Sequence, residues 1–106
     1  MDRESLVANL RKFKKRIEKK YKVDKIILFG SRAESKKRLS YENDVDIIII
    51  GRFKKKDNLS RAPPFYLEWN LDLPVDFICY TQEEFDKLSK MITIAKEAKR
   101  RGIVIE

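Results

Sequence analysis

Two aspartates, Asp44 and Asp46, open a run of β-branched residues and are the first side chains in the sequence that could do chemistry. Aspartate is uncommon in strands, and because side chains alternate along a strand the two carboxylates share one face. Their mutual repulsion would be offset by a cation, for which a divalent ion with oxygen ligands is the natural candidate. The alternative is a solvated strand end, because so short a motif often occurs by chance.

Asp76 is a third carboxylate, in the otherwise apolar run at 74–80 (PVDFICY). A lone carboxylate in a buried strand is unfavourable unless it is paired or bound to metal. If this strand lies beside the one that Asp44 opens, three carboxylates converge and could hold two divalent cations of the kind that serve phosphoryl transfer. At an exposed edge Asp76 would simply lie in water, and the nearby Asp72 is expected in a loop.

Gly30 and Ser31 follow a short apolar run and form the third feature. The glycine allows a tight turn, and free backbone N–H groups at the start of a following helix can bind anionic oxygens. The Ser31 hydroxyl would add a donor, and Arg32 is placed to add positive charge. A Gly-Ser pair alone is an ordinary turn in most proteins, so its value lies in its position between two predicted strands.

The composition limits the chemistry. The chain has 106 residues, with 25 Lys and Arg, 17 Asp and Glu, no His and one Cys, Cys79. Histidine-dependent nucleophiles, histidine-ligated zinc and an intrachain disulfide are therefore excluded. The length predicts a single domain over residues 1–106, and the cysteine usage favours a reducing, cytoplasmic location. No apolar run could span a membrane, and the net charge of +8 attracts polyanions, although a solvated lysine-rich surface is the simpler explanation.

Hydrophobic spacing and turn residues predict the elements that position these groups. In the first half of the chain we expect a helix over 3–20 with Asp2 as its N-cap, a strand over 25–29, a helical turn or loop over 32–39 and a strand over 44–50. A basic loop over 51–61, a short helix over 65–71 and a strand over 74–80 should follow. The chain should then form one helix from the Thr81–Glu84 capping box to near Gly102, with Phe85, Leu88, Met91, Ile92 and Ala95 on one face, and a short strand over 103–105. The order α-β-α-β-α-β-α predicts an α+β fold with a mixed sheet of three to four strands packed with helices.

The sequence at 27–33 (ILFGSRA), followed by 44–49 (DVDIII), resembles the signature of the DNA polymerase β-like nucleotidyltransferase superfamily, and in particular its minimal nucleotidyltransferases. The resemblance covers nearly the whole chain and implies the small nucleotidyltransferase fold. It also implies that Gly30 and Ser31, beside Arg32, bind the triphosphate of a nucleotide. It further implies that Asp44, Asp46 and Asp76 are catalytic and hold two Mg²⁺ ions, for which Mn²⁺ can substitute.

The resemblance implies an enzyme that moves a nucleoside monophosphate, AMP in the leading interpretation, from ATP to a hydroxyl group. Minimal nucleotidyltransferases are commonly paired with a small helical HEPN protein, so a HEPN toxin is the implied partner and an antitoxin role the implied function. Two alternatives stay open. One is an antitoxin with weak or no catalysis that inhibits by contact. The other is a small basic nucleic-acid-binding protein, which is not favoured because the chain has no recognition motif.

Overall fold

The computed structural model describes residues 1–30, 33 and 44–106. Its elements are α1 (Arg3–Ile17), β1 (Val23–Phe29), β2 (Val45–Gly51), α3 (Asn58–Arg61), α4 (Pro63–Glu68), β3 (Val75–Tyr80), α5 (Gln82–Leu88), α6 (Ile94–Arg101) and β4 (Ile103–Ile105). The strands form one sheet in the order β3-β2-β1-β4, in which β2 runs parallel to β3 and antiparallel to β1, and β4 runs antiparallel to β1. This mixed sheet confirms the predicted α+β fold. The turn or loop expected over 32–39 lies outside the described residues except for Ala33.

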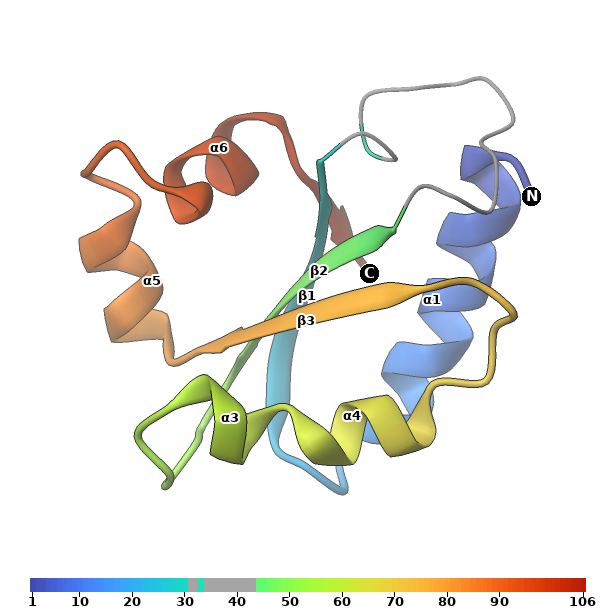
Figure 1. Ribbon diagram of the computed structural model, residues 1–106, viewed down its shortest axis with the longest axis horizontal. Helices are drawn as coiled ribbons and strands as arrows, with labels where there is room; N and C mark the ends of the chain where they lie inside the picture. The colour runs from blue at the N-terminus through green and yellow to red at the C-terminus, as the bar shows by residue number, and fades with distance from the viewer. Residues whose placement is uncertain (31–32, 34–43) are drawn as a thin grey trace.

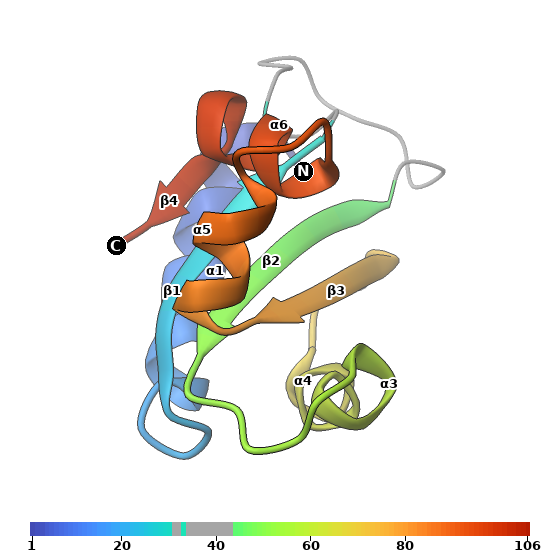
Figure 2. The same cartoon turned by 90° about the vertical axis from the view of Figure 1, so that its left-hand side faces the viewer.

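Helices cover both faces of the sheet (Figures 1 and 2). The α1 and α4 helices pack on one face, and α5 and α6 pack on the other. Strand β2 contributes alternate residues to each side, with Ile47 and Ile49 in the core beneath α1 and Ile48 and Ile50 in the core beneath α5 and α6. Burial on both faces explains why this strand is an unbroken apolar run after Asp46.

Helix α1 begins where the sequence predicts and ends earlier, at Ile17. The Asp2 side chain caps it by accepting a hydrogen bond from the Ser5 N–H at 2.8 Å. The apolar stripe of the helix ends at Ile17, and Lys22, with a φ of 56°, turns the chain into β1. In the described residues, no helix is both long and apolar enough to cross a membrane.

The outer edge of β3 is closed by side chains of α3 and α4. The Asn58 amide donates to the Phe77 carbonyl at 3.1 Å and accepts from the Cys79 N–H at 2.8 Å, while the Phe77 N–H donates to the Tyr66 hydroxyl at 3.1 Å. A sheet edge whose polar groups are satisfied in this way offers little to another strand. The predicted loop over 51–61 is therefore wrong for its last four residues, which form α3. A single helical turn is too short to show periodicity.

The single helix predicted to run from Thr81 to near Gly102 is wrong, although the Thr81–Glu84 capping box is confirmed. The chain forms two helices, α5 and α6, because Thr93 starts a new one: its hydroxyl oxygen accepts from the Lys96 N–H at 3.3 Å, and its hydroxyl donates to the Leu88 carbonyl at 2.6 Å. The connection leaves two apolar side chains largely in solvent, with exposed fractions of 49% for Met91 and 98% for Ile92. A threonine hydroxyl that competes for backbone groups thus overrides the apolar spacing.

Candidate active site

The three predicted carboxylates lie at the same end of the sheet, where β1 ends and β2 and β3 begin. The strand register pairs Asp46 with Phe29 on one side and with Asp76 on the other. Matched positions on neighbouring strands present their side chains on the same face, about 4.8 Å apart. Asp44 lies two residues before Asp46 and therefore shares that face, the one covered by α5 and α6.

Asp46 is the most enclosed of the three, being partly buried where Asp44 and Asp76 are exposed. Burial raises the pKa of Asp46, and the negative charges of Asp76 and then Asp44 raise it further. The carboxylates are thus close enough to repel one another, and a cation would relieve that repulsion. Within the described ranges, no three His, Cys, Asp or Glu side chains are grouped closely enough to hold a metal ion. A shared ion would therefore require the exposed Asp44 and Asp76 side chains to rotate toward it.

Gly30 ends β1 directly against Asp46. Its φ of +76° lies in the left-handed region that favours glycine. A Cβ atom added to Gly30 would stand 2.5 Å from the Asp46 Oδ2 atom, so the carboxylate occupies the space that a side chain would need. The sequence predicts a glycine turn here but gives no signal for this contact. The other two predicted nucleotide-binding residues, Ser31 and Arg32, lie outside the described residues.

A cavity of about 580 Å³ opens beside Gly30, between the end of β1 and the start of α6. Its volume is in the range of small-molecule sites. The described residues that line it are Phe29, Gly30, Ile92, Thr93, Ile94, Glu97 and Arg101. Sequence reasoning missed this cavity because it assigned Ile92 to the buried face of a continuous helix. The threonine before a second apolar run, Thr93, was the available signal for a new helix start.

In comparison with protein families, the model of the nucleotidyltransferase domain aligns with residues 10–101. Comparison with curated proteins and with solved structures gave no match. The aligned span runs from the middle of α1 to the end of α6 and contains Gly30 and all three carboxylates. With its mixed sheet and acidic edge, this chain belongs to the nucleotidyltransferase domain family, within the DNA polymerase β-like superfamily.

Proposed function

We propose that this nucleotidyltransferase moves AMP from ATP to a hydroxyl group, with Asp44, Asp46 and Asp76 as its catalytic carboxylates. Membership of the family gives nucleotidyl transfer as the general activity, an NTP as the substrate and divalent metal ions as the usual cofactors. The observation that carries the assignment of residues is the register of β2 and β3, which sets Asp46 beside Asp76 at the sheet edge where Gly30 turns.

The donor set fits a hard divalent cation, because carboxylate oxygens are the ligands that such ions prefer and a bound cation would relieve the repulsion between them. Mg²⁺ is the proposed ion, with Mn²⁺ as a substitute, and the proposed ligands are Asp44, Asp46 and Asp76. When bound, two such ions would lower the pKa of the acceptor hydroxyl and neutralise the triphosphate. Asp46, between the other two, is the carboxylate best placed to be shared.

In the proposed reaction the acceptor oxygen forms a bond to the α-phosphorus of ATP. The bond from that phosphorus to the bridging oxygen breaks, and pyrophosphate leaves. Asp76 is exposed, so one of its carboxylate oxygens can take the proton of the incoming hydroxyl. Gly30, Ser31 and Arg32 are the proposed phosphate-binding residues, with backbone N–H groups of this turn as the donors. The apolar wall of the 580 Å³ cavity offers the base a surface to pack against.

The proposed acceptor is a hydroxyl of a HEPN-type partner protein, on which this chain acts as an antitoxin, in the cytoplasm. Support for this partner is the resemblance to the minimal nucleotidyltransferases. The experiment is incubation of the protein with [α-³²P]ATP, Mg²⁺ and the product of the adjacent gene. Label on that product would support both AMP transfer and the partner.

The matched variants are Asp46→Asn and Asp72→Asn. The second removes the same charge from an exposed position before β3. We expect Asp72→Asn to retain transfer and Asp46→Asn to lose at least 100-fold, because a shared metal ligand is removed. Equal transfer by both variants would contradict the assignment of Asp46. Partner inhibition without any label would favour an antitoxin that acts by contact.

A further inference from the structure

A second cavity, of about 230 Å³, lies at the other end of the sheet from the acidic edge. The aromatic residues Tyr21, Phe53 and Phe65 line it, together with Arg52, Lys54 and Lys55 of the basic segment at 51–56. That segment starts at Gly51, five positions beyond Asp46 and therefore about 17 Å along the strand. We propose that this cavity and its basic rim bind single-stranded nucleic acid, with a base against the aromatic rings and phosphates on the lysines. The proposal is independent of the proposed transferase chemistry.

The aromatic wall consists of one buried ring with two partly exposed rings beside it. Phe65 is fully enclosed, and the ring centroids of Tyr21 and Phe53 lie 5.4 Å and 6.1 Å from its own, both in edge-to-face geometry. The cavity is smaller than the roughly 300–1,000 Å³ of sites for drug-sized ligands. Its size and its aromatic lining suit one planar base.

The rim carries positive charge, most of which no carboxylate of the described residues pairs with. Residues 51–56 (GRFKKK) contain four cations and no carboxylate. In the part of the chain that the structure describes, the ammonium groups of Lys54, Lys55 and Lys56 make no ion pair or hydrogen bond. Arg52 makes only a loose, exposed pair with Asp24, at 3.7 Å. Three neighbouring ammonium groups without partners complement a chain of phosphates.

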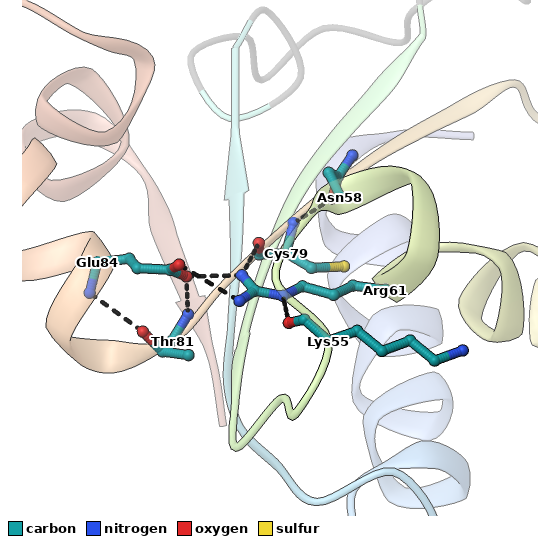
Figure 3. A network of polar contacts seen from close by, with 6 residues as sticks. All are labelled: Lys55, Asn58, Arg61, Cys79, Thr81 and Glu84. Carbon is teal, nitrogen blue, oxygen red and sulfur yellow. Dashed lines mark hydrogen bonds and ion pairs between the residues drawn. The ribbon is translucent and has the colours of Figure 1, made fainter.

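The segment is fixed in place by Arg61 (Figure 3). This buried guanidinium donates to the Lys55 carbonyl at 2.6 Å and to the Cys79 carbonyl at 3.2 Å, and it pairs with the Glu84 carboxylate at 2.6 Å. It also lies 5.3 Å from the centre of the Phe53 ring. Figure 3 shows the Lys55 side chain extending away from this network. The binding surface is therefore largely preorganised, which reduces the entropy lost on binding.

A nucleic-acid strand uses both parts of this surface, because every base has a face that stacks and every nucleotide brings a phosphate. An acidic protein would complement the lysines but would leave the aromatic cavity without a planar group. A double helix would bring phosphates while its bases remained stacked on each other. The arrangement therefore favours a single strand with accessible bases.

The test is fluorescence anisotropy with a labelled mixed-sequence DNA single strand of about 12 nucleotides, titrated between roughly 50 and 200 mM salt. We expect the triple variant Lys54→Ala, Lys55→Ala, Lys56→Ala to bind on the order of 100-fold more weakly at about 0.1 M salt, with a salt slope reduced by about 2, since each lost contact removes about 0.7 from that slope. Phe53→Leu should weaken binding about tenfold with the slope unchanged, because stacking releases no counterions.

Two controls keep the result interpretable. The triple variant Lys87→Ala, Lys90→Ala, Lys99→Ala removes the same charge from exposed positions on and beside α5 and α6, and should change the affinity by less than about threefold. Phe53→Tyr keeps the ring and should bind like the wild type. The proposal is overturned if both triple variants lose affinity equally, if the matching duplex or an equally charged polyphosphate binds as tightly, or if the wild-type protein does not bind the strand.

Discussion

At the scale of the residue, Gly30 is held by two independent constraints, its left-handed φ and its contact with Asp46. Gly30→Ala should lower the free energy of unfolding by about 1–3 kcal/mol, because alanine strains that backbone and its Cβ atom displaces the carboxylate. Urea denaturation measures the change. In an Asp46→Ala background the same substitution should be less destabilising, since the clash is gone and only the strain remains. If the two substitutions changed the free energy of unfolding additively, the contact between Gly30 and Asp46 would contribute nothing to stability.

Asp46 also allows catalysis and stability to be separated. Asp46→Asn keeps the side-chain volume and removes one charge from a repulsive cluster, and Asp44→Asn does the same at its exposed neighbour. In metal-free protein the melting temperature should therefore hold or rise, while nucleotidyl transfer is abolished. Thermal unfolding and transfer are measured on the same preparation. Lower stability with undiminished transfer would identify the aspartates as structural instead.

The sequence was sufficient to single out the three carboxylates as candidates, because aspartate in or at the start of an apolar strand is uncommon. That Asp46 and Asp76 lie side by side could be predicted only on the condition that their strands are neighbours, because the pattern of one sequence does not reveal which strands pair. The cavity beside Gly30 could not be found, because it depends on where α6 begins.

At the scale of the element, the long periodic segments were predicted well. The α1 helix and the three longer strands were predicted to within a few residues, because each buries enough apolar side chains to show its period. The errors lie at α3 and at the break between α5 and α6, where local capping decides the structure. Asp57 caps α3 by accepting from the Ser60 N–H at 2.9 Å, a signal that a Lys-rich segment obscured.

Thr93 gives the matching prediction for α6. Thr93→Ala removes the hydroxyl that accepts from the Lys96 N–H at the start of α6 and donates to the Leu88 carbonyl. The substitution should lower the free energy of unfolding by about 1–2 kcal/mol. Thr93→Ser keeps the hydroxyl and is the control, expected within about 0.5 kcal/mol of the wild type. Chemical denaturation followed by circular dichroism measures both. Equal losses in the two variants would indicate that the methyl group, not the hydroxyl, stabilises the break.

At the scale of the whole molecule, the sheet separates two ends of opposite chemistry. Carboxylates gather where β2 and β3 begin, and lysines that have no partner among the described residues gather where β2 ends. The proposed transfer would use the first end for a metal-bound triphosphate, and the proposed strand binding would use the second. The net charge of +8 is therefore compatible with the proposed acidic site, because the excess positive charge lies elsewhere in the chain.

The ion pair between Arg61 and Glu84 connects α3 to α5 across the end of β3, and it makes the stability of the whole molecule depend on pH (Figure 3). The hydrogen bond from Arg61 lowers the pKa of Glu84, and hydrogen bonds from Thr81 lower it further. Because the folded-state pKa lies below the ordinary value of 4.5, the resulting stabilisation is present above that value. It is lost as the pH falls through the folded-state pKa.

Arg61→Met tests this dependence, because it keeps much of the side-chain length and removes the charge and its donors. Near neutral pH it should lower the free energy of unfolding by about 2–4 kcal/mol. Most of this loss should come from the Lys55 and Cys79 carbonyls, which lose their donor. The lost ion pair should contribute less, because the Glu84 side chain is 39% exposed and solvent screens its charge. Below pH 4.5 the gap to the wild type should narrow. Arg52→Met, at an exposed pair, should cost less than about 0.5 kcal/mol at any pH. Urea denaturation across this range decides the matter, and an acid-induced loss in Arg61→Met as large as in the wild type would mean that another carboxylate carries the pH dependence.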